Sequence, residues 1–574
     1  MSSDTTDETF DVLIVGAGMS GICTLHSIRT RFPNWRVRVL DSAPSVGGTW
    51  YWNRYPGARF DSESLSYTFS FDQKLLDEWH WKERFSAQPD TLAYINFVAD
   101  RLNLRPDIQL NTRIVSARWS DDEHRRWIFA DETGRSYSAR FFISCLGFLS
   151  NPTLPAIPGI QDFEGQAFHT SRWPTDMSHR DVVAGKRVGI IGTGATGIQT
   201  ITALAKIPEL KSLTVFQKQA MWAAPLRNNT ISKEDMNEER KNYAETFRLR
   251  SESPTGFIHS PDKRKSNEAT PEERLKLWES LYNKPGMGKW LSVFSDTYTN
   301  REANNLYSAF VADKIRARVN DPEIAEKLVP KDHGFGLARV PLESGYYEVY
   351  NQPNIHLADI SVNGIAKITP TGITLEDGTS YQLDVLIYAT GFNAITGAFV
   401  NVDFRGKDNV PLMAQSGEAD ADRAAWLDFM PQTYLGITVP KFPNMFMVLG
   451  PHQPFGNATP NIEHAVKVVT SMLETCYEKD ITYVEATEEA ADYWNDHVVR
   501  GSEGALLNEV DSWMTGINKN VGRVKRGVVR YAGSALEYRR QCAKAKESGW
   551  DGLVMLKDQG AMQEANPSRT LAKL

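Results

Sequence analysis

The sequence is poor in cysteine, in long apolar runs and in excess positive charge. It has 4 cysteines in 574 residues and no C-x-x-C pair, which argues against a disulfide framework, a zinc site or a dithiol reductase. We therefore expect no bound metal. Apolar runs such as FFISCLGFL are far shorter than the ~20 residues that cross a bilayer. The net charge of −7 gives no general attraction to nucleic acid or to an anionic membrane.

Length and composition favour a soluble protein of several domains. A chain of 574 residues is too long for one ordinary core, and two to four domains are expected. Hydrophobic residues make up 41% and charged residues 24%, as is usual for globular proteins. The acidic, polar start MSSDTTDETFD is unlike a signal or transit peptide, so we expect a cytoplasmic location.

The first glycine motif is DVLIVGAGMSGI, residues 11–22. A β-forming run leads into Gly16, Gly18 and Gly21 in the pattern G-x-G-x-x-G, and helical sequence follows. These glycines allow a tight turn, close approach of the backbone to a pyrophosphate, and packing of helix on strand. The next strand, RVRVLD, ends in Asp41, 20 residues after Gly21, where an acid can bind a ribose 2′-hydroxyl. The strand, glycines, helix, second strand and acid follow one another at the spacing of a dinucleotide site, which we therefore predict. The alternative is a glycine-rich turn in another α/β unit.

A second motif of the same kind is KRVGIIGTGATGIQTITALA, residues 186–205. Its turn contains Gly192, Thr193, Gly194 and Gly197, and the following strand SLTVFQ leads to Lys218 instead of an acid. A cation there can hold a 2′-phosphate, which favours NADP over NAD, although a solvated surface lysine is the alternative. Together the motifs predict FAD in the first unit and NADPH in the second, and hence a flavoprotein oxidoreductase whose flavin takes hydride from the nicotinamide.

We predict an α/β protein with two Rossmann-like dinucleotide-binding domains and a helical insertion in the NADP domain. An insertion without a role in binding is the alternative for that segment. The tail DQGAMQEANPSRTLAKL is expected to be unordered. The predicted division is 1–150 for the first part of the FAD domain, 151–229 for the first part of the NADP domain, 230–331 for the insertion, 332–389 for the second part of the NADP domain, and 390–574 for the return to the FAD domain with the tail.

Two further segments could carry chemistry. GGTWYWNRYPGARFD, residues 47–61, could bring backbone and aromatic rings against a flavin, although such aromatics are also common in cores; its only carboxylate is Asp61. HGFGLARVPLESGYYEVYN, residues 333–351, contains a single arginine, Arg339, which could pair with a structural carboxylate or hold an anionic oxygen species without giving up a proton. The further flavin-binding candidates are Gly48, Thr49, Trp50 and Tyr67.

The stretch FEGQAFHTSRWP, residues 163–174, has no metal-ligand spacing and no nucleophile beside a base. Its Phe163, Gly165, His169 and Trp173 instead match F-x-G-x-x-x-H-x-x-x-W-[P/D], a signature of the type I Baeyer–Villiger monooxygenases. The pattern G-G-x-W ending in P-G-x-x-x-D, filled from Gly47 to Asp61, is similar to the second signature of that family. The similarity runs from about Phe10 to Met555 and includes GFGLAR, YATGF and DSWMTGIN.

The resemblance implies an FAD-dependent enzyme that uses NADPH and O2 to insert one oxygen atom beside a ketone carbonyl, through a flavin C4a-peroxide, to give an ester or lactone. Arg339 would stabilise the peroxide anion, Asp61 would pair with Arg339 and tune it, and Trp513 would contact bound NADP. His169 and Trp173 would belong to a linker that couples the two nucleotide domains. The partners would be a small ketone and O2, and a monomer is favoured although the oligomeric state is open.

Two other functions are alternatives. A related flavin monooxygenase could oxygenate sulfur or nitrogen, but such relatives usually lack a tryptophan at the position of Trp173. A redox-sensing protein could bind both nucleotides without turnover; it would consume no NADPH in oxygenated buffer. Fold resemblance alone does not decide between them, and the matched site residues carry the assignment.

One departure from the family pattern leads to a prediction about the cofactor. Relatives usually carry lysine immediately before the catalytic arginine, where it helps to hold the NADP 2′-phosphate, but here the residue is Ala338. Lys218 must then supply more of the discrimination. We predict that NADPH is still preferred over NADH, by a smaller margin than in those relatives. Initial rates with the two nucleotides at equal concentration test this, and equal efficiency would show that the Lys218 argument is wrong.

Overall fold

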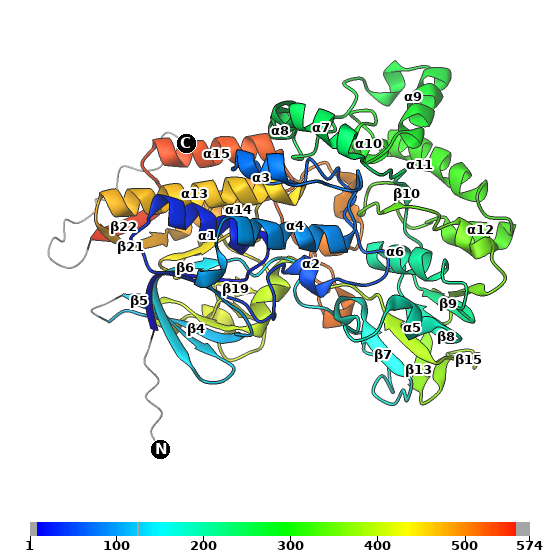
Figure 1. The fold of residues 1–574 in the computed structure, drawn as a ribbon, viewed down its shortest axis with the longest axis horizontal. Coiled ribbons are helices and arrows are strands. Elements are labelled where there is room, and N and C mark those ends of the chain that lie inside the picture. Colours follow the sequence, from blue (N-terminus) through cyan, green and yellow to red (C-terminus); the bar gives the residue numbers. More distant parts are fainter. Residues whose placement is uncertain (1–7, 123–124, 558–574) are drawn as a thin grey trace.

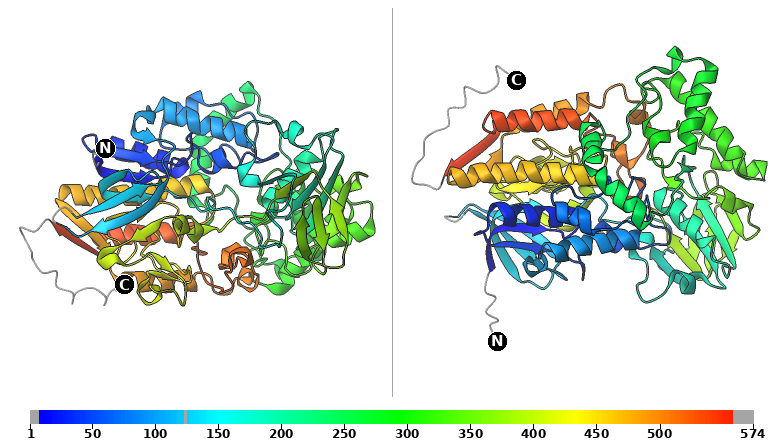
Figure 2. Two further views of the ribbon diagram at one scale, coloured as in Figure 1. Left: turned by 90° about the horizontal axis from the view of Figure 1, so that it is seen from below. Right: turned by 45° about the horizontal axis from the view of Figure 1, so that its top comes forward.

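The computed structural model describes residues 8–122 and 125–557, so the predicted unordered tail from residue 558 lies outside the described residues. Two units lie side by side, the first built around a mixed sheet with parallel central strands and the second around an all-parallel sheet (Figures 1 and 2). Within the described part of the chain, every helix is too short or too polar to span a bilayer.

The first unit is built on a sheet of eight strands. Its order is β17-β4-β5-β6-β1-β2-β3, and β20 also pairs with β6. The central strand β1 (Glu8–Val15) is apolar on both faces and runs parallel to β2 and β6, as expected of a strand covered on both sides. The other strands are β2 (Val37–Leu40), β3 (Ile108–Gln109), β4 (Ile114–Ser120), β5 (Arg126–Asp131), β6 (Ser136–Ser144), β17 (Asp403–Arg405) and β20 (Met445–Met447).

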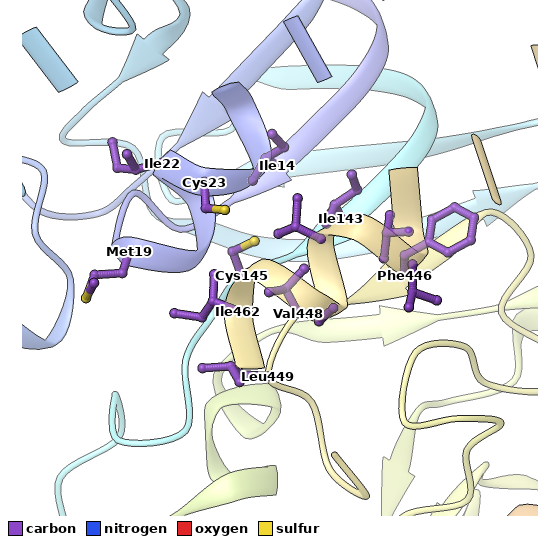
Figure 3. Close-up of a cluster of buried hydrophobic side chains, with 14 of the residues drawn as sticks. Ile14, Met19, Ile22, Cys23, Ile143, Cys145, Phe446, Val448, Leu449 and Ile462 are labelled. Atoms are coloured by element: carbon purple, nitrogen blue, oxygen red, sulfur yellow. The ribbon is translucent and has the colours of Figure 1, made fainter. Parts of the chain in front are cut away.

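The core of the first unit joins segments from both ends of the chain. Helix α1 (Met19–Arg31) packs on α13 (Ala458–Glu478), and β20 pairs in parallel with β6. Figure 3 shows side chains of these elements meeting around Cys23 and Cys145. All four cysteines are free and buried. Residues after 444 therefore complete the sheet that the N-terminal segment begins.

The second unit has a five-stranded, all-parallel sheet in the order β12-β9-β8-β16-β7. Strand β8 (Arg187–Ile191) leads into α6 (Ala195–Leu204) and β9 (Ser212–Gln217), which repeats the path of β1, α1 and β2. The predicted strands and helices of both glycine motifs are thus present. The remaining strands are β7 (Gln166–His169), β12 (Ile355–Asp359) and β16 (Val385–Tyr388), with an antiparallel meander of β13 (Ile365–Thr369), β14 (Gly372–Leu375) and β15 (Ser380–Gln382) before β16.

The expected insertion is helical. Its helices are α7 (Lys233–Lys241), α8 (Tyr243–Glu252), α9 (Pro271–Asn283), α10 (Gly288–Leu291), α11 (Arg301–Arg316) and α12 (Pro322–Leu328). Capping boxes at Ser232 and Thr270 fix where α7 and α9 begin. Figures 1 and 2 place α7 and α8 beside helices of the first unit. The insertion therefore touches both units.

Arg250 on α8 makes the deepest of these contacts. Its side chain is 3% exposed and its guanidinium lies 2.8 Å from the Glu463 carboxylate of α13. The same group donates to the carbonyl oxygens of Ser66 and Thr68 at 3.0 and 2.8 Å. Since a buried cation is tolerated only when paired and hydrogen-bonded, this set of bonds fixes α8 on the first unit.

We predict that Arg250→Met lowers the free energy of unfolding by about 3 kcal/mol, because it leaves the Glu463 carboxylate and two carbonyls without their partner. The matched control is Arg248→Met on the same helix. Arg248 pairs with Glu245 and Glu252 on the surface, where ion pairs contribute little to stability. Its replacement should therefore leave the free energy of unfolding nearly unchanged. Urea unfolding followed by tryptophan fluorescence measures both variants. Equal losses in the two would contradict the importance of the buried contact.

Candidate active site

A cavity of about 690 Å³ is lined by residues of both units. Of the residues predicted from the sequence, it brings together Gly16, Gly18, Asp41, Gly48, Thr49, Trp50, Asp61, Tyr67, Gly194, Arg339 and Trp513. Those outside its lining are Gly21, Gly192, Thr193, Gly197, Lys218, Phe163, Gly165, His169 and Trp173. The predicted residues are thus divided between the cavity and the structure that surrounds it.

The two glycine turns have the same geometry. Gly16 has φ +111° and Gly192 has φ +108°, and a Cβ on either would come within 2.3 Å and 2.5 Å of the carbonyl oxygens of Cys145 and Ala389. A Cβ on Gly21 would lie 1.8 Å from the Gly16 oxygen. These positions need glycine for their backbone conformation and for packing of helix on strand.

The helix ends at these turns fit the pyrophosphates of two dinucleotides. Gly18 caps α1 and Gly194 caps α6, and neither end has a side-chain cap that would occupy the free N–H groups. A Cβ built on Gly194 would meet nothing within 4 Å, so the turn opens into the cavity. Backbone N–H groups and the helix dipole make such ends anion-binding sites. The residues present therefore fit FAD at the first turn and NADP at the second.

Asp41 is held at the end of β2 by the backbone. Its carboxylate accepts hydrogen bonds from the N–H groups of Ala17 at 2.6 Å and Ala43 at 2.7 Å. Burial raises the pKa of this carboxyl, and the two backbone bonds oppose that effect. Each oxygen accepts one of these bonds and can accept another, and Asp41 lines the cavity, as a ribose-binding acid requires.

The segment 47–61 forms one wall of the cavity. Gly48 has φ +52°, and a Cβ there would lie 2.8 Å from the Cα of Gly18, so two glycines are needed where the backbones approach. The Trp50 ring donates a hydrogen bond to the Tyr67 hydroxyl at 3.1 Å, and both rings pack with Phe60. Each of these aromatic residues packs in the hydrophobic core and also lines the cavity.

Arg339 and Asp61 form an ion pair across the two units. The Arg339 Nη2 lies 2.9 Å from the Asp61 Oδ2, which also accepts from the Leu342 N–H at 3.3 Å. The Asp61 side chain is 3% exposed, whereas that of Arg339 is 39% exposed in the open cavity. Burial raises the pKa of Asp61 and the nearby guanidinium opposes this. The carboxylate anchors a cation that still faces the cavity.

Gln199 on α6 fastens the same segment to the second unit. It accepts a hydrogen bond from the Tyr55 hydroxyl at 2.8 Å and donates to the Arg59 carbonyl at 3.1 Å. Gly57 has φ +81°, and a Cβ there would lie 2.6 Å from the Gln199 carbonyl oxygen. The pattern P-G-A-R therefore lets this loop lie directly on α6, two residues before Asp61.

The motif around His169 lies at the edge of the second sheet. His169 ends β7, donates through Nε2 to the Gly391 carbonyl at 3.1 Å, and accepts at Nδ1 from the Ser171 N–H at 3.1 Å. Trp173 is buried against Phe168. Arg172, the one member of this stretch that lines the cavity, stacks over Trp52 of the first unit at 4.3 Å. The stretch thus touches both units.

The predicted 2′-phosphate residue lies outside the cavity lining. Lys218 follows β9 and is exposed, and the adjacent Gln219 accepts a hydrogen bond from Thr193 in the glycine turn at 2.7 Å. This contact ties the lysine-bearing loop to the turn. The position is that of the residue which distinguishes the two nicotinamide nucleotides in such folds.

Comparison with known proteins identifies the family. Residues 10–224 match the model of the flavin-binding monooxygenase-like family. The chain is 39% identical to 2-oxo-Δ3-4,5,5-trimethylcyclopentenylacetyl-CoA monooxygenase of Pseudomonas putida, over 97% of this chain and 100% of that one. It is 37% identical to cyclohexanone 1,2-monooxygenase of an Acinetobacter species, over 97% and 99%. A crystal structure of OTEMO in complex with FAD and NADP superposes with a TM-score of 0.89 at 39% identity, covering 96% of this chain and 100% of that one.

The chain belongs to the Baeyer–Villiger monooxygenases. The family named from the two signatures is therefore confirmed, as is the predicted α/β fold with two Rossmann-like domains. The assignment as an FAD-dependent monooxygenase is confirmed at the level of the family, over the sulfur- and nitrogen-oxygenating alternative.

Sequence reasoning missed three residues of this monooxygenase site. Tyr55 and Gln199 join the units, and Arg530 lines the cavity. Tyr55 directly precedes Pro56 and Gly57 of the second family signature, and this place beside a turn is the signal that could have found it. Nothing in the local sequence around Gln199 or Arg530 indicates which distant segment each will meet.

The neutral His169 predicts a pH dependence of stability. Burial lowers its pKa to about 4, so the folded protein holds the ring neutral while the unfolded chain protonates it near pH 6.5. Stability from this group is present above pH 6.5 and falls as the pH drops toward 4. Between pH 7 and pH 5, wild type should lose about 1–2 kcal/mol more than His169→Gln.

Urea unfolding at both pH values measures this difference. The buried His452 and His464, whose pKa values are lowered to about 4 and about 3, titrate alike in both proteins and cancel. Identical pH dependence in wild type and variant would contradict the prediction.

Proposed function

We propose that the protein uses FAD, NADPH and O2 to insert one oxygen atom beside the carbonyl of a ketone, giving an ester or lactone. The observation that carries this is the Arg339–Asp61 pair, which lies in one cavity with both dinucleotide turns. Family membership gives the reaction class, and the cavity gives residues suited to it.

Each of the two glycine turns would hold one cofactor. Gly16, Gly18 and Asp41 would hold FAD, with Gly48, Thr49, Trp50 and Tyr67 along its ring and linkage. Gly192, Thr193, Gly194 and Gly197 would hold NADPH, with Lys218 at its 2′-phosphate and Trp513 in contact with the nucleotide. When bound, the flavin accepts hydride from NADPH and activates O2 for transfer of one oxygen atom to the ketone.

Arg339 would stabilise negative charge that develops on oxygen during the transfer. A guanidinium is a fixed cation, and that of Arg339 lines the cavity, where such a charge acts more strongly than in water. Asp61 would orient it through the 2.9 Å bond without occupying the whole guanidinium. The carboxylate is thus a positioning residue and the arginine the catalytic one.

An apolar wall would keep this step dry. The Phe148 and Phe455 rings meet at 4.7 Å, and the Trp513 ring lies 6.2 Å from Phe455, all in the cavity lining. Water at this point would divert the oxygen to hydrogen peroxide. Trp513 lies on a short turn, η9 (Trp513–Thr515), and that turn would close over the bound nucleotide.

The other expectations stay predictions. We propose the domain division given from the sequence, with the motif from Phe163 to Trp173 as the element that couples the domains. We likewise propose a monomeric state, a cytoplasmic location and the use of O2.

We predict that Arg339→Ala still allows NADPH to reduce the flavin but lowers ester or lactone formation by at least ~100-fold, as loss of a charge-stabilising group in an active site does. Anaerobic stopped-flow reduction and mass spectrometry of products under 18O2 measure the two steps separately in one protein. Arg339→Lys should restore a small part of the yield, because it keeps the charge without the planar fork. Undiminished ester formation in Arg339→Ala would overturn the assignment.

A further inference from the structure

The charged residues that line the cavity are mostly arginines. They are Arg59, Arg113, Arg172, Arg339 and Arg530, against Asp41 and Asp61. Three of the arginines have a carboxylate partner: Arg339 pairs with Asp61 at 2.9 Å, Arg59 with Glu83 at 3.1 Å, and Arg113 with Glu132 at 3.5 Å. Arg172 donates to the Ser171 carbonyl at 2.8 Å and stacks on Trp52. Arg530 differs from all of them.

Arg530 has no ion pair or hydrogen bond with another residue in the described part of the chain, and its Nε is buried without a partner. Burial lowers the pKa of its guanidinium to about 10. Arg530 as a whole is half-buried, and no carboxylate among the described residues compensates the hydration lost at its buried Nε, which makes the unpaired charge unfavourable. A residue of this kind is suited to an anion that arrives with a ligand.

Arg530 belongs to the apolar wall and not to the pyrophosphate sites. Its neighbour Val529 packs with Ala394 and Ile395, in the cluster that Phe455 and Trp513 adjoin. The Tyr531 N–H donates to the Gln453 carbonyl at 3.2 Å, so residues 529–531 run beside 452–455. The helix ends that suit the pyrophosphates instead follow Gly18 and Gly194, in other segments.

We propose that Arg530 binds an anionic group of the substrate, so that the preferred substrates are ketones that carry a carboxylate or the phosphate groups of a thioester carrier away from the carbonyl. A guanidinium offers a planar pair of donors to either group. Arg339, held by Asp61, would face the reacting carbonyl, and Arg530 would hold the far end. This inference rests on the proposed function, because it concerns the ketone of that reaction.

The experiment compares matched ketones. The FAD-containing protein is assayed with NADPH and O2 on linear and cyclic keto acids of increasing length, each as the free carboxylate, the coenzyme A thioester and the neutral methyl ester. We expect kcat/KM for an anionic form to exceed that of its methyl ester by at least ~10-fold, the size of a charge-assisted hydrogen bond. If the free carboxylate has the higher kcat/KM relative to the methyl ester, the protein recognises the carboxylate. If the coenzyme A thioester has it, the protein recognises the phosphate groups.

Variants assign the effect to Arg530. The ratio of anionic to neutral kcat/KM should fall at least ~10-fold in Arg530→Gln and less in Arg530→Lys. The ratio is insensitive to loss of folded enzyme. The matched control is Arg523→Gln, which removes another buried arginine that has no carboxylate partner among the described residues. Arg523 stacks on Phe429 outside the cavity lining, and its replacement should keep the ratio.

Two results would overturn the inference. One is a methyl ester that is preferred at every length. The other is a ratio of anionic to neutral kcat/KM that is unchanged in Arg530→Gln, and if this variant also loses FAD or raises the KM for NADPH, Arg530 serves the cofactors instead. The proposed function would fail differently, by giving no ester or lactone from any form of any ketone.

Discussion

The site depends on a carboxylate that is buried in one unit and a guanidinium that comes from the other. Asp61 follows the glycine-rich wall of the first unit, and Arg339 follows the helical insertion of the second. Burial makes the charged carboxylate unfavourable, and the bond to Arg339 compensates only while the units keep their positions. The same contact therefore orients a cation that lines the cavity and ties the geometry of the cavity to the relative position of the two units.

Backbone contacts as well as side chains hold the two units at the spacing that the Asp61–Arg339 bond needs. Gly57 lies against the Gln199 carbonyl of α6, and Tyr55 is bonded to the Gln199 side chain, so the loop carrying Asp61 is attached to the second unit just before the ion pair. His169 and Arg172 make a second attachment through Gly391 and Trp52. A shift of either unit would disturb these contacts and the Asp61–Arg339 bond together.

What the sequence could predict follows from the range over which its patterns act. The strand–glycine–helix units were predictable because G-x-G-x-x-G imposes a local geometry, and Gly16 and Gly192 have that geometry in full. The roles of Arg339 and Asp61 came from resemblance, because nothing local indicates that residues 278 positions apart will meet. The contact of Arg250 with Glu463, 213 positions away, was not predictable for the same reason. Periodicity describes which face of a helix is buried and not which element covers it.

The distribution of charge follows from how the fold handles phosphates. Two helix ends without side-chain caps offer free N–H groups to phosphates, so the cavity needs few cations for that purpose. Its arginines are then available for other anions, and their partners distinguish them. Arg339 is paired with the buried Asp61 carboxylate, so its charge is compensated whether or not a ligand is bound. Arg530 has none among the described residues, so its interaction energy changes only when a ligand brings the charge. A cation that is already paired, such as Arg339, suits the stabilisation of charge that exists only briefly. A cation without a partner among the described residues, such as Arg530, suits the recognition of a charged ligand.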